Sequence, residues 1–329
     1  MNYSIIVPVY NRPEEVKELL DSLTLQEYEN FEVLIIEDGS KNTCSHVIEM
    51  FRNKLNLFYY FKENEGPGPT RNFGSERASG DYLIFFDSDC LVPSLYLKNV
   101  DEMIKKHKPD AFGGPDAAHE NFTPIQKAIS YSMTSFFTTG GIRGKKRGMD
   151  KFHPRSFNMG ISKQVYSVTG GFRKMRFGED IDFSLRIIES GFRTMLFEKA
   201  FVYHKRRTNF RQFFKQVFNS GIARINLNKR HPGTLKMVHI LPSLFLVFNL
   251  ILLIGAFFQP MFLLPVILYA FIVFTDSLRF YKSFKVSLLS IIASYVQLFG
   301  YGSGFINAFW KRKILGLDEF HAYEKNFYK

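Results

Sequence analysis

Residues 81–90 read DYLIFFDSDC, a hydrophobic run that ends at two carboxylates, Asp87 and Asp89, on either side of one serine. In an extended segment alternate side chains point to the same face, so the two carboxylates would face one point and repel each other. A positive group between them would remove this repulsion. The stretch therefore predicts a β-strand that ends at a site for a cation.

Three earlier segments have the same strand-like form and also end in polar residues, namely SIIVPVY (4–10), FEVLIIEDGS (31–40) and LNLFYYFKEN (55–64). Segments with helical spacing separate them, such as PEEVKELLDSL after the first strand and RNFGSERA before the fourth. Strands that alternate with helices predict an α/β fold, with a mostly parallel sheet that is covered on both sides.

The ends of these strands carry the residues that suggest a site, because ligands of open α/β sheets bind at the carboxyl ends of the strands. The residues at three of these ends are Pro8, Tyr10, Asn11 and Arg12; Glu37 and Asp38; and Asp87 and Asp89.

The stretch EGPGPTRNFG (65–74) is rich in glycine and proline, and a helix is expected to begin at about Pro69 with Arg71 in its first turn. An arginine at an exposed helix start suits a phosphate group, and a solvated helix arginine is the alternative.

The composition changes near residue 230. The chain has 329 residues and a net charge of +12, and this length suits one large domain or a medium domain with an appendage. Three long apolar stretches follow, at 241–258, 261–275 and 286–310. About 20 apolar residues cross a bilayer, so two or three of these stretches are candidate spans; a buried soluble core is the alternative.

Basic residues flank the apolar stretches and predict their orientation. By the positive-inside rule the first stretch leaves the cytosol and the second returns, which keeps residues 1–207 cytosolic. A third crossing would expose Lys311, Arg312 and Lys313 outside, and this stretch contains Gly300, Gly302 and Gly304, so a re-entrant or interfacial segment is expected there.

Other features define the surroundings of the protein. The N-terminus turns polar within a few residues, so no signal peptide is expected, and two cysteines, Cys44 and Cys90, offer no disulfide framework.

Basic residues alternate with phenylalanines in 206–232, which predicts an amphipathic helix on the membrane surface. The glycine-rich basic segment 138–152 is either a loop that closes over a substrate or an ordinary solvated loop. The positive charge favours anionic lipid or a phosphorylated substrate and does not argue for nucleic acid.

Five motifs in order, IIVPVYNR, IIEDGS, GPGPTRN, FFDSD and FNMGISKQVYSVTGGFRKMRFGEDIDFSLRI, together resemble family 2 glycosyltransferases of the GT-A fold over about residues 4–207. The resemblance implies a Rossmann-like nucleotide-binding catalytic domain at 1–207. An amphipathic interfacial helix (208–234), a membrane segment (235–310) and a basic tail (311–329) are expected to follow it.

The resemblance also implies a nucleotide-sugar donor, Mg²⁺ or Mn²⁺, and inversion at the anomeric carbon. In the implied metal site, Asp89 and His204 bind the ion and Asp87 lies near it and near the donor's ribose or sugar. Asp38 is expected to hydrogen-bond the nucleotide base. The other implied donor-binding residues are Pro8, Tyr10, Arg12, Glu37, Arg71, Ser88, Arg206 and Arg207.

On the acceptor side, the resemblance implies Asp180 as the general base and Glu179 as a contact to acceptor or donor sugar, with Asn158 and Gly160 nearby. Asp182 is expected to point elsewhere. Simpler roles remain open, since Asp38 precedes a turn glycine and Glu179 and Asp180 also suit the first turn of a helix. The chain lacks the Gln-x-x-Arg-Trp motif of the family's polysaccharide synthases, which disfavours a processive polymerase.

The sequence therefore predicts an inverting glycosyltransferase that moves one sugar from a UDP- or GDP-sugar to a hydroxyl of a lipid-linked or envelope glycan. The expected location is the inner or plasma membrane of a bacterium, in contact with membrane lipids. The alternative within the class is a polyprenyl-phosphate sugar synthase. Two alternatives lie outside the glycosyltransferase class. One is a phosphohydrolase, which is disfavoured because its Asp-x-Asp motif should follow the first strand, and the other is an inactive nucleotide-binding scaffold.

Overall fold

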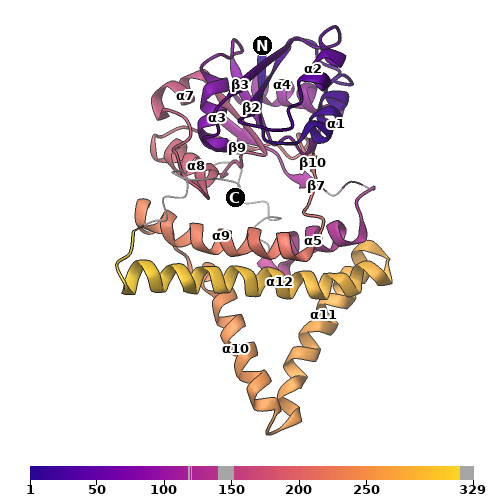
Figure 1. Cartoon of the computed structure of the whole chain (residues 1–329), viewed down its shortest axis with the longest axis vertical. Helices are drawn as coiled ribbons and strands as arrows, with labels where there is room; N and C mark the ends of the chain where they lie inside the picture. The colour runs from indigo at the N-terminus through magenta and orange to yellow at the C-terminus, as the bar shows by residue number, and fades with distance from the viewer. Residues whose placement is uncertain (118, 120, 140–151, 319–329) are drawn as a thin grey trace. The chain divides into compact units, whose positions relative to one another are not determined.

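The computed structural model in Figure 1 describes residues 1–117, 119, 121–139 and 152–318. These residues form two compact units. The first contains residues 1–117 and 152–204, and the second contains 119, 121–139 and 205–318.

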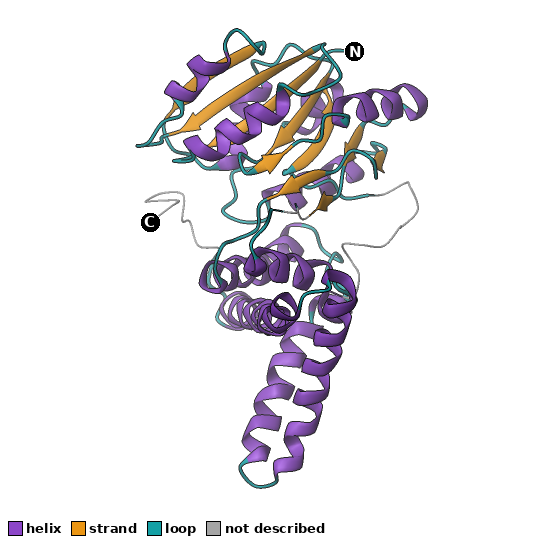
Figure 2. Ribbon diagram, turned by 90° about the vertical axis from the view of Figure 1, so that its right-hand side faces the viewer, coloured by secondary structure: helices purple, strands orange, loops and turns teal. Residues whose placement is uncertain are grey.

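A mixed sheet forms the centre of the first unit (Figure 2). Its strand order is β3-β2-β1-β4-β8-β6-β9, and every neighbouring pair is parallel except the two that β8 makes with β4 and β6. The predicted α/β class is therefore confirmed, with one antiparallel strand inside the sheet. The strands are β1 (Tyr3–Val9), β2 (Phe31–Asp38), β3 (Leu57–Lys62), β4 (Tyr82–Phe86), β6 (Ala111–Gly113), β8 (Asn158–Ser162) and β9 (Thr194–Leu196).

Helices cover both faces of this sheet, as the sequence predicts. Alternate residues of β1 belong to opposite cores, with Ile5 and Val7 in one and Ile6 in the other, because side chains of a strand alternate between faces. One core includes side chains of α1 (Pro13–Leu23), α2 (Ser45–Phe51) and α4 (Tyr96–His107). The other includes side chains of α7 (Lys163–Thr169) and α8 (Glu179–Glu189), and α3 (Pro67–Ser75) packs on the same face.

Helix α3 begins at Pro67, two positions before the predicted start at Pro69. Proline suits a first helical position because the N–H that it lacks would have no partner inside the helix. Within α3, a Cβ on Gly74 would lie 2.6 Å from a methyl of Ile6, so glycine allows this helix to lie close to β1.

A second, three-stranded sheet joins distant parts of the first unit. Strand β10 (Val202–His204) pairs antiparallel with β5 (Cys90–Leu91), with His204 opposite Cys90, and parallel with β7 (Asp116–Ala117). This pairing carries His204 to the residues that follow β4.

The prediction that Asp87 and Asp89 lie in an extended segment was wrong. Strand β4 ends at Phe86, and a turn follows in which the N–H of Cys90 donates to the carbonyl of Asp87 at 3.1 Å. The two carboxylates approach each other because the chain turns, and not because they alternate along a strand.

The second unit consists of helices. Helix α9 lies along α12, and α10 and α11 form a hairpin that projects from them (Figure 1). The α-helices are α5 (Pro124–Thr134), α6 (Phe136–Thr139), α9 (Phe210–Arg230), α10 (Leu241–Ala256), α11 (Leu264–Tyr281) and α12 (Phe284–Phe309). Shorter helical turns cover Met237–His239, Pro260–Leu263 and Trp310–Ile314.

The glycines of the third apolar stretch serve close helix packing. A Cβ on Gly304 would overlap the carbonyl of Phe218 on α9, and one on Gly221 would overlap the carbonyl of Tyr301 on α12. The two helix backbones can therefore approach closely. The re-entrant alternative for this stretch was wrong, because α12 is one continuous helix of 26 residues.

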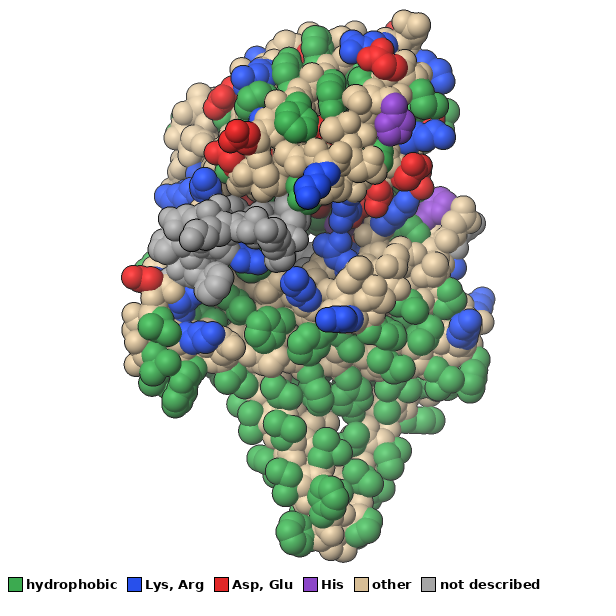
Figure 3. Space-filling model, in the orientation of Figure 1, with side chains coloured by type: hydrophobic (Ala, Val, Ile, Leu, Met, Phe, Trp, Pro, Cys, Tyr) green, Lys and Arg blue, Asp and Glu red, His purple; other side chains and the backbone are tan. Residues whose placement is uncertain are grey.

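Two helical segments are long and apolar enough to cross a membrane, Pro260–Tyr281 and Phe284–Ile314, and α10 is shorter at 16 residues. In the apolar window of Pro260–Tyr281 only 11% of the residues are buried, so the described part of the chain does not enclose this segment in a core. Figure 3 shows hydrophobic side chains over the surface of the projecting hairpin. At the tip of this hairpin of α10 and α11, Phe257 and Phe258 are 90% and 85% exposed. The exposed apolar surface of the hairpin suggests membrane association.

Replacing Gly304 with alanine should loosen the contact between α9 and α12. The new methyl would overlap the backbone of α9, so we expect a loss of about 1–3 kcal/mol of stability, measured as a lower melting temperature in detergent. Ile306→Ala is the control, because Ile306 lies on the same helix and is 40% exposed. Equal melting of the Gly304 variant and the wild type would contradict the close helix contact.

Candidate active site

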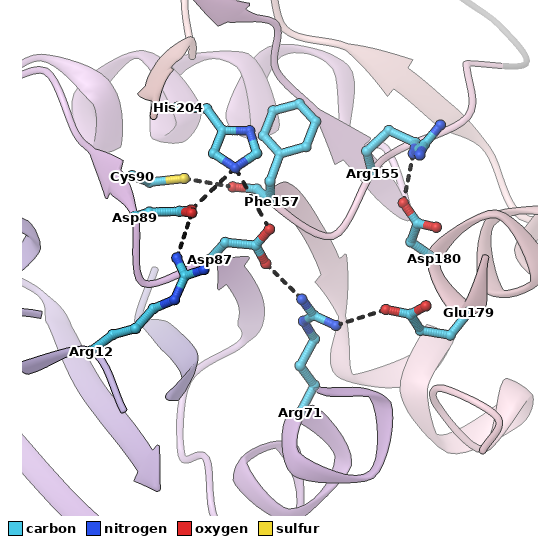
Figure 4. Close-up of polar contacts among 10 residues, drawn as sticks. All are labelled: Arg12, Arg71, Asp87, Asp89, Cys90, Arg155, Phe157, Glu179, Asp180 and His204. Carbon is cyan, nitrogen blue, oxygen red and sulfur yellow. Dashed lines mark hydrogen bonds and ion pairs between the residues drawn. The ribbon is translucent and has the colours of Figure 1, made fainter. Parts of the chain in front are cut away.

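Three predicted site residues, Asp87, Asp89 and His204, meet beyond the end of β4 (Figure 4). The Nε2 atom of His204 lies 3.1 Å from Oδ1 of Asp89 and 3.9 Å from Oδ2 of Asp87. The ring of Phe157 stacks on the imidazole, with centroids 5.0 Å apart and planes at 15°. The imidazole is therefore held with Nε2 directed at both carboxylates.

Two arginines form ion pairs with the two aspartates of this group. Arg12 Nη1 lies 2.7 Å from Oδ2 of Asp89, and Arg71 Nη2 lies 2.6 Å from Oδ1 of Asp87. Burial alone would raise the pKa of Asp89, but the positive charges of His204 and Arg12 outweigh it and hold this pKa well below its usual range. Asp89 is therefore a carboxylate at neutral pH.

The group fits a hard divalent cation. Oδ1 of Asp89 is buried and has no hydrogen-bond donor within the described part of the chain, and it faces an imidazole nitrogen. Carboxylate oxygens and an imidazole nitrogen suit Mg²⁺ or Mn²⁺. The neighbouring thiol of Cys90 also lies within reach, but it contacts the carbonyl of Phe157 at 3.5 Å, and burial raises its pKa well above the usual value. A protonated thiol is a poor metal ligand, so the donor set is oxygen and nitrogen.

Arg71 extends from this group to the start of α8. Its Nη1 lies 3.4 Å from Oε1 of Glu179, its side chain is 3% exposed, and its guanidinium stacks over the ring of Phe172 at 5.3 Å. The alternative that Arg71 is a solvated helix arginine was therefore wrong. One buried cation links a carboxylate beyond β4 with a carboxylate of α8.

Asp180 has a different partner, Arg155, whose Nε lies 2.6 Å from Oδ2. The other oxygen, Oδ1, accepts from the N–H of Ile181 at 2.8 Å. Burial alone would raise the pKa of Asp180, but Arg155 and this N–H outweigh it and lower the pKa. For Glu179, burial and the charge of Asp180 together raise the pKa to about 7. The pKa values of these two adjacent carboxylates therefore differ because their surroundings differ.

The predicted nucleoside pocket lies at the ends of β1 and β2. The buried carboxylate of Asp38 accepts from the N–H groups of Glu65 and Gly66 at 2.9 and 2.8 Å, and Lys62 Nζ lies 3.2 Å away. The buried Glu37 accepts from the N–H of Cys44 at 2.6 Å and from the Ser40 hydroxyl. Both carboxylates thus accept hydrogen bonds from backbone N–H groups of neighbouring segments and hold those segments in place. Pro8 and Tyr10 are half-buried, and Ser88 is buried between the two aspartates of the turn.

The two other predicted acceptor-side residues lie in the core. Asn158 accepts from the Tyr96 hydroxyl at 2.5 Å and donates to the carbonyl of Ala200 at 2.8 Å. At Gly160 a Cβ would overlap the ring of Phe112. These contacts account for both residue types by packing, and the acceptor role of both stays a prediction. Asp182 points to Arg173 and Arg186, at 3.3 and 2.9 Å.

The remaining predicted residues, Arg206 and Arg207, belong to the second unit, and their donor-binding role stays a prediction. The basic segment 138–152 lies mostly outside the described residues.

A family model described as Glycosyl transferase family 2 matches residues 4–170, which is just over half of the chain. The chain belongs to glycosyl transferase family 2. The match covers the ends of β1, β2 and β4 and stops before Glu179, Asp180 and His204.

Curated relatives of this family 2 chain include glycosyltransferases. An uncharacterized glycosyltransferase of Rickettsia felis is 33% identical over 135 residues, which are 41% of this chain and 22% of that protein. The poly(ribitol-phosphate) β-N-acetylglucosaminyltransferase TarS of Staphylococcus aureus is 37% identical over 114 residues, 33% of this chain and 20% of TarS. The chain therefore spans only about a fifth of the length of these relatives.

Solved structures share the GT-A fold with this chain. The mannosyltransferase PcManGT of Pyrobaculum calidifontis, in complex with GDP-Man and Mn²⁺, has a TM-score of 0.64 at 15% identity and covers 90% of this chain and 87% of its own. S. aureus TarS 1-349 in complex with UDP-GlcNAc has a TM-score of 0.51 at 18% identity, with coverages of 95% and 92%.

Sequence reasoning missed Arg155 and Phe157. Both lie in PRSFNMG (154–160), directly before β8, and act on partners distant in sequence, Asp180 and His204. A local pattern carries no signal for such pairing. The motif FNMG marked the segment, but only the fold shows which of its side chains reach the site.

Replacing Arg71 with methionine should strongly destabilise the protein. Asp87 and Glu179 would each lose their arginine partner, and breaking a buried ion pair by removing one partner costs about 3–5 kcal/mol. The measurement is thermal unfolding in detergent at neutral pH. Arg52→Met is the matched control, since Arg52 is 55% exposed and pairs with Glu49 on the surface of α2, where a pair contributes about 1 kcal/mol or less. Similar losses in the two variants would contradict the bridging role of Arg71.

Proposed function

We propose that the protein is an inverting, metal-assisted glycosyltransferase that moves one sugar from a UDP- or GDP-sugar to a hydroxyl of a lipid-linked or envelope glycan. One observation carries the proposal. Arg71 connects the carboxylates beyond β4, which suit a donor diphosphate and its metal, with the carboxylate pair at the start of α8, which suits an acceptor hydroxyl.

On the donor side, Asp89 and His204 would hold Mg²⁺ or Mn²⁺, with Asp87 beside them. The complexes of TarS 1-349 with UDP-GlcNAc and of PcManGT with GDP-Man and Mn²⁺ support a nucleotide-sugar and a divalent metal for this fold. When bound, such an ion neutralises the negative charge that develops on the leaving nucleoside diphosphate. Arg12 and Arg71 place two further positive charges beside the same carboxylates, which favours the same charge development.

On the acceptor side, Asp180 is the proposed general base. Its lowered pKa keeps it ionised at neutral pH, and only an ionised carboxylate can take the hydroxyl proton. Arg155 fixes one of its oxygens, so the carboxylate is held in one orientation. Glu179 has a pKa of about 7 and so is partly protonated, which allows it to donate a hydrogen bond to a sugar hydroxyl.

We further propose that residues 1–207 form the catalytic domain on the cytosolic side of a bacterial membrane, with 208–234 at the interface, 235–310 in contact with lipid and 311–329 as a tail. The exposed apolar hairpin and the flanking cations Lys236, Arg279, Lys282 and Lys285 support this arrangement, because cationic flanks favour the cytosolic side.

The experiment that tests this function measures release of nucleoside diphosphate from a panel of UDP- and GDP-sugars with Mg²⁺ or Mn²⁺ and a membrane lipid extract. We expect metal-dependent release with one donor, and loss of this release in Asp89→Asn. Asp21→Asn, an exposed substitution on α1, should behave as the wild type. Metal-independent release, or full activity in Asp89→Asn, would refute the proposed donor site.

The general base is tested by Asp180→Asn, which should lower kcat by about 10²-fold or more. The measurement is transfer to the lipid extract with the donor found above. Full turnover in Asp180→Asn, together with loss in Asp89→Asn, would instead indicate a polyprenyl-phosphate sugar synthase, because a lipid phosphate acceptor needs no deprotonation.

Arg155 should set the pH dependence of the reaction. Because Arg155 lowers the pKa of Asp180, Arg155→Gln should raise that pKa, so Asp180 is protonated at higher pH and the acid limb of the kcat profile moves upward. The other charges near Asp180 are Glu179, which precedes it on α8, and Arg71 of α3, and both remain in the variant. Arg155→Lys should restore most of the profile. Arg173→Gln is the control, since Arg173 pairs with Asp182, and an equal shift in this control would contradict the assignment.

A further inference from the structure

The segment around α9 has an unusual charge distribution. From Lys199 to Thr275 the sequence contains no aspartate or glutamate, although it contains ten lysines and arginines. Two of these, Arg211 and Lys215, are exposed on the first half of α9 and are one helical turn apart. This region presents positive charge with no acidic side chain of its own to balance it.

The arrangement is unfavourable for the helix by itself. Like charges at positions i and i+4 destabilise a helix by a few tenths of a kcal/mol, and cations near its N-terminus oppose the helix dipole. The first turn of α9 has no acidic residue, and neither Arg211 nor Lys215 forms an ion pair with any residue that the structure describes. An anion bound beside both side chains would reverse this cost.

A groove lies beside the same two cations. It has a volume of about 660 Å³ and is lined by Asn209, Arg211, Gln212, Phe214, Lys215 and Phe218. The rings of Phe214 and Phe218 stack with centroids 6.2 Å apart, and Phe214 is 41% exposed. The groove therefore combines two cationic groups with an aromatic wall.

The phenylalanines of α9 divide between two environments. Phe213 and Val217 are buried in a core that also contains residues of α5 and α12. Phe214 and Phe218 instead line the groove. The amphipathic helix predicted within 206–232 corresponds to α9, and its place on the membrane surface stays a prediction. Residues of α12 and α5 pack with one apolar side of α9, and the exposed aromatic wall is a second apolar side.

We propose that this groove binds the phosphate and the first isoprenoid units of a polyisoprenyl-phosphate-linked acceptor. Arg211 and Lys215 contact the phosphate, and the apolar chain lies along Phe214 and Phe218. This inference rests on the proposed function and names the carrier of its acceptor. The backbone N–H groups of the helix start are not the site, because the side chain of Asn209 already accepts from the N–H of Gln212.

The chemistry of the groove favours a lipid phosphate over an anionic polyol-phosphate polymer. A polymer of phosphodiesters and hydroxyls would be matched by cations and polar groups alone, whereas the groove places stacked rings next to its cations. The same compact unit carries the exposed apolar hairpin of α10 and α11, so a membrane-embedded chain is the occupant that matches its surroundings.

The test measures binding of a fluorescent polyisoprenyl phosphate to the full chain in nanodiscs of neutral lipid. We expect Arg211→Gln/Lys215→Gln to weaken binding by about 10- to 30-fold, because each cation contributes to attraction of an anion at the surface. Lys229→Gln/Arg230→Gln removes the same charge from the other end of α9 and should change binding less than about twofold. Phe214→Ala/Phe218→Ala should weaken binding of the polyisoprenyl phosphate but not of a short-chain alkyl phosphate.

Three outcomes would overturn the proposal. Equal losses in the two charge variants would mean diffuse attraction without a site. Binding of inorganic phosphate as tight as that of the lipid would remove the role of the aromatic wall. Competition by a soluble polyol-phosphate polymer at lower concentration than the lipid would assign the groove to a polymer acceptor. Binding is measured without donor, so absence of nucleoside diphosphate release in the wild type would refute the proposed function and leave this measurement valid.

Discussion

Arg71 holds two carboxylates from distant parts of the chain, Asp87 beyond β4 and Glu179 at the start of α8, with a guanidinium that is 3% exposed. A buried cation without partners would be very costly, and the loss of this cation would leave the largely buried Glu179 without its ion pair. The three groups therefore stabilise one another only while α3, the turn after β4 and α8 keep their places. The chemical arrangement of the site and the stability of the first unit depend on the same contact.

The position of His204 depends on strand pairing in the same way. It reaches Asp89 because β10 pairs with β5, the two-residue strand that directly follows the Asp87–Asp89 turn. The stacked ring of Phe157 then fixes the orientation of the imidazole. A cation-binding cluster is thus assembled from a turn, a short sheet and one aromatic contact, and each comes from a different part of the sequence.

The sequence predicted the elements of this site better than their contacts. Short, nearly continuous apolar runs that end in polar residues located β1, β2 and β4, because parallel strands that are buried on both faces need such runs. The carboxyl-end rule then brought Arg12 and Asp89 to one edge. The sequence did not predict the turn at Asp87 or the pairing of Arg155 with Asp180, since both depend on hydrogen bonds and packing that no local pattern encodes. The glycines of α12 led to the expectation of a re-entrant segment for a related reason. Glycine is frequent both where two helices pack closely and where a chain is irregular, so the composition does not distinguish these two cases.

The two acids at the start of α8 differ because of the way that their cations are shared. Arg71 divides one positive charge between Asp87 at 2.6 Å and Glu179 at 3.4 Å, whereas Arg155 contacts Asp180 at 2.6 Å. Burial and the charge of Asp180 raise the pKa of Glu179, and the shared charge of Arg71 offsets them only in part. For Asp180, Arg155 and the N–H of Ile181 outweigh burial and lower the pKa. Of the two acids, Asp180 is the one whose lowered pKa keeps it ionised at neutral pH, which is the state that the proposed general base requires.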